Sequence, residues 1–219
     1  MNMSGLLEKD LRLTVKRKQT LVIFVFMALI MGISTEGTFI IGYLVMLGII
    51  LAIGSISYDE YDNGFAFLMT LPVKRKTYVL EKYLFCAGMS AVSWIVAVIV
   101  SFVLETVRGN AVSLAEELPM MLMIVPMMMT MAAIMIPLQL RFGAEKSRIV
   151  LFVIFGAVIA GSFFMKRLVT PEESSLQRLA MKLEGLSPAL GLAVSFGICL
   201  VLCSISYLCS VKVMERKEF

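Results

Sequence analysis

The sequence has no histidine among its 219 residues, and only 16% of them are charged. Without histidine the chain lacks the commonest metal ligand and general base, which argues against a zinc site and against Ser-His chemistry. The low charge content argues against a soluble domain, where about a quarter of residues are charged. Cysteine is scarce too, and its positions inside apolar runs predict small buried side chains rather than disulfides or metal ligands. The four cysteines are Cys86, Cys199, Cys203 and Cys209.

Apolar residues make up 59% of the chain and come in long blocks. A helix of about 20 apolar residues crosses a bilayer core of roughly 30 Å. The blocks therefore predict an all-α integral membrane protein, with a single transmembrane domain over residues 1–219 and six transmembrane helices. The first block is short and would cross the bilayer with local thinning. We place the spans at about 20–34, 39–57, 83–104, 118–140, 149–165 and 189–211.

Small residues follow one face of two predicted spans, and we expect helix contacts on these faces. In lipid, small side chains let helix backbones approach closely, because packing rather than exclusion of water drives association. On the second span they are Gly48, Ala52 and Ser55, and on the third they are Cys86, Ser90, Ser93, Ala97 and Ser101.

The fourth predicted span, 118–140, holds eight methionines and three prolines. Pro126 at mid-span should kink the helix, because proline removes a backbone hydrogen bond. Methionine is flexible and suits surfaces that repack around apolar ligands. One interpretation is ordinary packing against lipid or core. The other is the mobile wall of a substrate path, formed by Met123, Pro126, Met127, Met128 and Met131.

Residues 1–19 predict an amphipathic helix that lies on the membrane surface. Apolar residues recur there every four positions, and charged residues fill the other faces. The charged stretch is too long for a secretory signal. The alternative is a disordered basic tail. The apolar positions are Met3, Leu7, Leu11 and Val15, with Leu6 beside them.

Charge distribution predicts the orientation of the six spans. An even number of spans puts both termini on one side, together with the polar segments 58–82 and 141–148. Fifteen of the 20 Lys and Arg residues lie on that side, and basic residues favour the cytoplasm. We therefore predict a multi-pass protein of the cell membrane with both termini in the cytoplasm and an extracellular loop at 166–188.

We find no motif that would bind a nucleotide or supply energy. Gly143 to Ser147 is similar to part of a phosphate loop, but it lacks the glycine directly before the lysine and the glycine further upstream. No predicted span has a charge near its centre, which argues against an ion-driven carrier. We expect no catalytic residue, no metal, no bound cofactor and no nucleic-acid partner. A membrane machine of this kind takes its energy from another protein.

The polar segment 58–82 is where such a partner could dock. It begins with three acids, passes through the apolar stretch 65–71 and turns at Pro72 into three basic residues, 74–76. Those basic residues can pair with acids of a partner or with anionic lipid. The alternative is a basic loop that only fixes the topology.

The layout resembles the permease subunits of ABC-2 type exporters. In these permeases an amphipathic helix precedes six spans. The second and third spans are joined by an acidic start, a Leu-Pro-x-x-Arg turn and a lysine that opens the next span. The matching residues here are Asp59 and Glu60, then Thr70-Leu71-Pro72-Val73-Lys74-Arg75, then Glu81-Lys82-Tyr83, and Leu7 to Leu11 is similar to the family's opening.

The resemblance implies a dimer with a second permease copy or a paralogue, surrounded by membrane lipid. It also implies cytosolic ABC ATPase subunits, which hold the ATP and Mg²⁺ and dock between spans two and three. The compact form is most similar to bacterial exporters of amphipathic peptides, such as phenol-soluble modulins or bacteriocins. The docking residues that it implies are Asp59, Glu60, Thr70, Leu71, Pro72, Val73, Lys74, Arg75 and Lys82.

Residues and resemblance together predict the permease subunit of an ATP-driven exporter of amphipathic substrates, which works by alternating access. The chain itself is not expected to be an enzyme. The alternative is a non-transporting scaffold or sensor subunit that recruits a cytosolic partner through segment 58–82.

Overall fold

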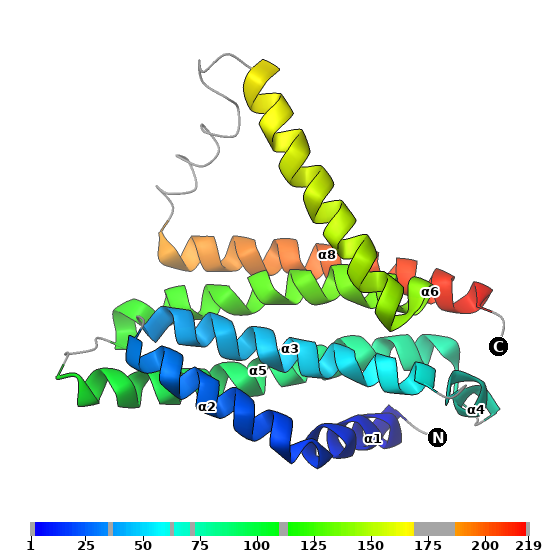
Figure 1. Ribbon diagram of the computed structural model, residues 1–219, viewed down its shortest axis with the longest axis horizontal. Helices are drawn as coiled ribbons and strands as arrows, with labels where there is room; N and C mark the ends of the chain where they lie inside the picture. The colour runs from blue at the N-terminus through cyan, green and yellow to red at the C-terminus, as the bar shows by residue number, and fades with distance from the viewer. Residues whose placement is uncertain are drawn as a thin grey trace.

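A computed structural model describes residues 3–34, 37–61, 64–70, 73–109, 114–168 and 187–217. These residues form seven α-helices and no strand, which confirms the all-α prediction (Figure 1). The helices are α1 (Met3–Lys16), α2 (Lys18–Ser34), α3 (Gly37–Glu60), α4 (Gly64–Thr70), α5 (Arg75–Val107), α6 (Leu114–Leu168) and α8 (Pro188–Arg216).

Four helices of the described residues are long and apolar enough to cross a membrane, so the prediction of six spans is not confirmed. The predicted first span belongs to α2, whose apolar part is too short for this count. The predicted fourth and fifth spans belong to one helix, α6, which is interrupted only at Gly143 rather than by a loop over 141–148. The four spans are Phe39–Glu60, Arg75–Val107, Glu117–Gly161 and Pro188–Arg216.

Helix α3 is the most deeply buried of the four spans and packs along both α5 and α6 (Figure 1). Its contact with α5 is close because Gly48 has no side chain. A Cβ atom placed on Gly48 would lie 2.0 Å from the hydroxyl oxygen of Ser93. The small-residue faces of both helices are buried there, with Ala52 1% and Ala97 0% exposed, which confirms the predicted contacts.

Hydroxyl groups satisfy a backbone group that proline leaves free in α6. Pro137 has no N–H, so the carbonyl of Ala133, four residues earlier, lacks its helical donor. The hydroxyl of Ser206 on α8 donates to that carbonyl, and the hydroxyl of Tyr83 on α5 lies 2.6 Å from the Ser206 hydroxyl. This chain of polar contacts connects α5, α6 and α8. The residue of α6 with non-helical φ and ψ is Gly143, and Pro126 lies within the helix.

The cysteines differ in exposure, so the prediction of four buried side chains is only partly right. Cys86 and Cys199 are buried, Cys203 is half-buried and Cys209 is exposed. Helix α8 contacts its neighbours through Cys199, Ser206 and Ser210, and Cys209 lies beside that face.

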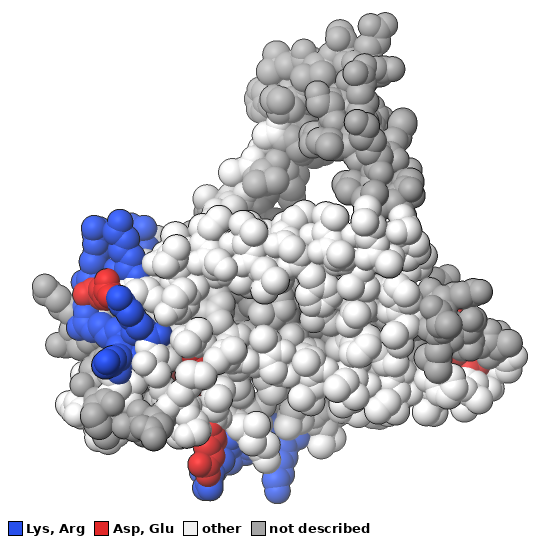
Figure 2. All heavy atoms as spheres, turned by 180° about the vertical axis from the view of Figure 1, so that it is seen from behind, with Lys and Arg blue, Asp and Glu red and all other residues white. Residues whose placement is uncertain are grey.

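The four basic segments of the chain meet at one end of the molecule (Figure 1). The guanidinium of Arg75, at the start of α5, donates to the carbonyls of Met214 and Glu215 at the end of α8, at 3.0 and 2.6 Å. The ammonium of Lys217 donates to the carbonyl of Leu140, just before the break in α6, at 3.2 Å. On the face shown in Figure 2, Lys and Arg gather over the end of α8 and over α1.

Candidate functional site

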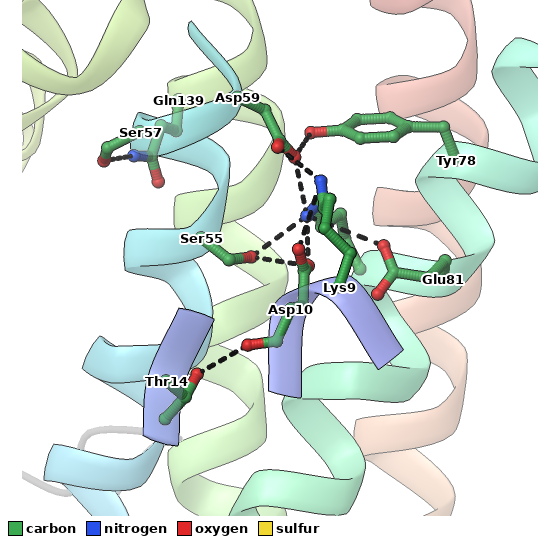
Figure 3. A network of polar contacts seen from close by, with 10 residues as sticks. Lys9, Asp10, Thr14, Ser55, Ser57, Asp59, Tyr78, Glu81 and Gln139 are labelled. Atoms are coloured by element: carbon green, nitrogen blue, oxygen red, sulfur yellow. Dashed lines mark hydrogen bonds and ion pairs between the residues drawn. The ribbon is translucent and has the colours of Figure 1, made fainter. Parts of the chain in front are cut away.

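A cluster of buried charged groups joins α1, α3 and α5 at this end of the molecule (Figure 3). Lys82, on the second turn of α5, is 1% exposed. Its ammonium lies 2.8 Å from Asp59 of α3 and 3.6 Å from its neighbour Glu81, and it contacts Asp10 of α1 directly. It also donates to the hydroxyl of Ser55, at 3.0 Å. One cation thus holds carboxylates from three helices.

Helix α1 packs against the cluster through residues that recur every four positions and so lie on one face of the helix. Leu6, Asp10 and Thr14 are the buried residues of α1, whereas Leu11 and Val15 of the predicted apolar stripe are 54% and 52% exposed. At Leu11 and Val15 the apolar stripe of the helix predicted to lie on the membrane surface points away from the rest of the chain. It does so because Asp10 binds Lys82, and burying an ionised carboxylate requires such a partner.

The surroundings of Asp10 favour its ionised form. The Ser55 hydroxyl donates to its carboxylate at 2.9 Å, and Lys9 lies 3.2 Å from it. Burial alone would raise the pKa of the Asp10 carboxyl. The charges of Lys82 and Lys9 and the hydrogen bonds from Lys82 and Ser55 outweigh burial, so the pKa lies below its ordinary value of 3.8.

Asp59 connects the cluster to the short helix α4. It pairs with Lys9 and accepts a hydrogen bond of 2.9 Å from the hydroxyl of the fully buried Tyr78. The ring of Phe65, on α4, packs edge-on against the Tyr78 ring, with 5.8 Å between the ring centroids. Helix α4 thus contacts the cluster through an aromatic pair.

The cluster contains three carboxyl groups and two ammonium groups. With all five ionised its net charge is −1. Glu81 is fully buried, and among the described residues neither of its carboxyl oxygens has a hydrogen-bond donor. Losing one partner of a buried ion pair costs about 3–5 kcal/mol, because the other charge stays unpaired in a low dielectric. The helices α1, α3 and α5 are thus held as one unit at this end.

A second polar connection leads from the end of α3 to the second part of α6. Gly143 has φ of 80°, a conformation that side chains disfavour, and a Cβ there would lie 2.5 Å from a carboxyl oxygen of Glu60. Glu60 accepts a hydrogen bond of 2.9 Å from the backbone N–H of Ala144, where the helix restarts, and lies 3.9 Å from Lys217. The carboxylate caps the restarted helix, where N–H groups lack helical partners.

The predicted docking residues divide into exposed and buried groups. Asp59 and Lys82 are buried in the cluster, and Arg75 binds the carbonyls of α8, so none of the three offers a free side chain to a partner. Thr70 and Lys74 are exposed. The remaining predicted residues are Glu60, which is half-buried, Val73, which is half-buried, and Leu71 and Pro72, which lie outside the described residues.

A groove between α1 and α4 lies beside the cluster, with a volume of about 540 Å³. Phe67 of α4 lines this groove and is 71% exposed. Tyr61, just before α4, is 74% exposed. Arg12 and Glu8 form the charged wall on α1, joined by an ion pair of 2.5 Å. Both aromatic residues lie in the predicted docking segment 58–82, and Phe67 in its apolar stretch 65–71, but neither was among the individual docking residues that the resemblance implied.

The predicted substrate-path residues do not share one surface. Pro126 lines an apolar groove of about 880 Å³ between α5, α6 and α8, next to Met129. Met127 and Met131 are 67% and 43% exposed. The remaining two, Met123 and Met128, are half-buried. Of the five predicted residues, only Pro126 lines this groove.

Sequence reasoning missed Lys9, Asp10, Tyr78 and Glu81 as members of the site. One signal was available. The spacing Leu6–Asp10–Thr14 places an acid on a face that repeats every four residues. Within the described part of the chain, no three His, Cys, Asp or Glu residues lie together as a metal site would require.

A family model described as "ABC-2 family transporter protein" covers residues 5–215. No curated protein and no solved structure matches the chain.

Proposed function

The chain belongs to the ABC-2 family of transporter proteins, and we propose that it exports amphipathic substrates, peptides among them, as the permease of an ATP-driven transporter. Membership makes the chain a multi-pass membrane permease subunit of an ABC transporter, and the family works in general with a cytosolic ATPase. The chain contributes no ATP site in this proposal. The ATPase supplies ATP and Mg²⁺.

The observation that carries the proposal is the buried cluster of Lys9, Asp10, Asp59, Glu81 and Lys82. It connects the two surface helices, α1 and α4, to the two spans α3 and α5. A load applied to α1 or α4 is passed to both spans, because the ion pairs cannot part without leaving buried charge. This arrangement suits a permease that a partner protein moves better than it suits a passive scaffold.

The docking surface that we propose is the groove between α1 and α4. Phe67 lines this groove and is the anchor in our proposal, since aromatic residues are enriched at protein interfaces. Thr70 and Lys74 extend it, and Tyr61 flanks it. The roles of Asp59 and Lys82 change accordingly: they position α3 and α5 behind the surface instead of touching the partner.

The proposed topology has six spans, with α2 as the first and the two parts of α6, on either side of Gly143, as the fourth and fifth. Both termini and α4 then face the cytoplasm. Support comes from the four basic segments, which meet at one end of the molecule, and from the preference of basic residues for the cytoplasmic side. A second copy or a paralogue completes the translocation path in this proposal.

Docking is tested by copurifying the full chain with its cytosolic ATPase and measuring stimulated ATP hydrolysis. The variant Phe67→Ala should weaken association on the order of tenfold or more, as loss of an aromatic anchor does. The matched control is Phe142→Ala, a 38% exposed phenylalanine outside the groove. Unchanged association and unchanged hydrolysis in Phe67→Ala would remove the docking proposal.

Transmission is tested separately with Tyr78→Phe, which removes the hydroxyl bound to Asp59 but keeps the ring packed on Phe65. Association with the ATPase should stay as in the wild type, while peptide export by proteoliposomes falls. If export equals that of the wild type, the cluster does not transmit motion.

A further inference from the structure

A second pocket at the basic end lies between the break in α6 and the last turns of α8, with a volume of about 450 Å³. Four of its lining residues are cations: Arg141 from α6 and Lys212, Arg216 and Lys217 from the end of α8 or just beyond it. None of them belongs to the buried cluster or to the groove between α1 and α4.

The spacing of α8 places exposed apolar residues on the helix face that leads to the cations of this pocket. Leu208, Lys212 and Arg216 follow one another every four residues, so they form a single ridge along the helix. Leu208 is 66% exposed, and Ile205, one turn earlier, is 54% exposed. The ridge therefore passes from exposed apolar side chains to cations within about two turns.

Three of the four cations that line the pocket have no acidic partner among the described residues. In the described part of the chain, Lys217 pairs with Glu60 at 3.9 Å, but Arg141, Lys212 and Arg216 form no ion pair with a carboxylate. Arg141 lies over its neighbour's ring, Phe142, with 5.2 Å to the centroid. Three like charges around one pocket create a positive potential that an anion would relieve.

The position of the pocket at the end of two spans favours a lipid over a soluble anion as its ligand. α8 and the first part of α6 are apolar helices able to cross a membrane, and the cations lie where both reach the basic end. Basic pockets between spans at the cytoplasmic surface suit anionic lipid headgroups. A soluble anion would use only the cations, whereas a lipid would also cover Leu208 and Ile205.

We propose that this pocket binds the headgroup of an anionic phospholipid. Its phosphate lies between Arg141, Lys212 and Arg216, and its acyl chains run along the exposed apolar ridge of α8. The site requires only that α6 and α8 span the membrane and does not depend on the exporter function.

The test is native mass spectrometry of the full chain released from detergent micelles and titrated with dioleoylphosphatidylglycerol or dioleoylphosphatidylcholine. The wild type should retain phosphatidylglycerol in preference to phosphatidylcholine. The double variant Lys212→Gln with Arg216→Gln should bind phosphatidylglycerol about 25-fold more weakly, since each cation near an anionic surface contributes about fivefold. The control, Lys146→Gln with Arg148→Gln, removes the same charge from exposed positions outside the pocket and should weaken binding much less, because these side chains do not contact a headgroup held in the pocket.

Three results would overturn the proposal. Equal loss in both double variants would mean diffuse attraction to the basic end. Equal retention of the two lipids by the wild type would mean that the headgroup is not recognised. Displacement of phosphatidylglycerol by soluble glycerol phosphate at similar concentration would mean that the pocket binds phosphate without the acyl chains. If the glutamine variant does not fold, the lipid preference of the wild type and the competition experiment still test whether the pocket binds an anionic phospholipid.

Discussion

Replacing Lys82 by methionine should destabilise the protein by about 3–5 kcal/mol, the range for removing one partner of a buried ion pair. The substitution keeps most of the side-chain volume, so the loss comes from charge. The wild-type ammonium contacts Asp10, Asp59 and Glu81 and is 1% exposed. After the change Lys9 is the remaining cation for all three carboxyl groups.

The assay is urea unfolding of the detergent-solubilised chain, followed by fluorescence of its single tryptophan. That residue, Trp94, lies on α5 and donates to the carbonyl of Met121 on α6 at 3.0 Å, so its emission reports separation of the two spans. The control is Lys76→Met, whose side chain is 68% exposed and makes one contact of 3.7 Å with Glu215. An exposed pair of this kind contributes about 0–1 kcal/mol.

Two outcomes would refute this reasoning. The first is a loss below about 1 kcal/mol for Lys82→Met, the limit for an exposed pair. The second concerns the double variant Asp10→Asn with Lys82→Met. Because the asparagine removes a carboxylate that has lost its partner, this variant should be more stable than Lys82→Met alone. A further loss of stability would show that the two residues are not coupled.

Three further predictions follow from the same contacts. Folding lowers the pKa of Asp10. The contribution of Asp10 to stability is therefore complete above the ordinary pKa of 3.8 and is lost as the pH falls toward the lower pKa of the folded state. The unfolding midpoint should fall more steeply below pH 4 in the wild type than in Asp10→Asn. Gly48→Ala should cost about 1–3 kcal/mol through overpacking against α5, whereas Gly42→Ala, with nothing within 4 Å of its Cβ, should not destabilise; thermal melting in detergent compares the two. In the folded protein a maleimide should label the exposed Cys209 quickly and leave the buried Cys86 unmodified, as peptide mass mapping would detect; equal labelling would contradict the packing of α5.

The sequence predicts the helices of this protein better than their ends. Apolar blocks determine where spans lie because only a helix satisfies its backbone in lipid. The charged residues around Gly143 predict a loop, but Glu60 caps the restarted helix at Ala144 and reduces the break to one residue. That capping carboxylate lies 84 residues earlier in the chain, so the composition around Gly143 does not reveal it.

The candidate site could be predicted from the sequence even less completely than the helix ends. Asp59 and Lys82 are recognisable as residues that mark the junctions of segment 58–82. A charged residue at the end of a span is ordinarily exposed, so sequence reasoning assigns both to a partner. Only the docking of α1 reveals that Asp10 binds Lys82 and that the charges face inward. The exposed surface then shifts to Phe67, which composition classes as an ordinary apolar residue.

The order of residues in the buried cluster has a consequence for how the chain is made. Asp10 precedes Lys82 by 72 residues, so a ribosome adding about 5–20 residues per second needs roughly 4–14 seconds to supply the partner. During that interval α1 carries a carboxylate that water solvates better than protein does. Helix α1 is therefore made before the partner of its carboxylate, and the pair of Asp10 with Lys82 can form only once α5 has been synthesised.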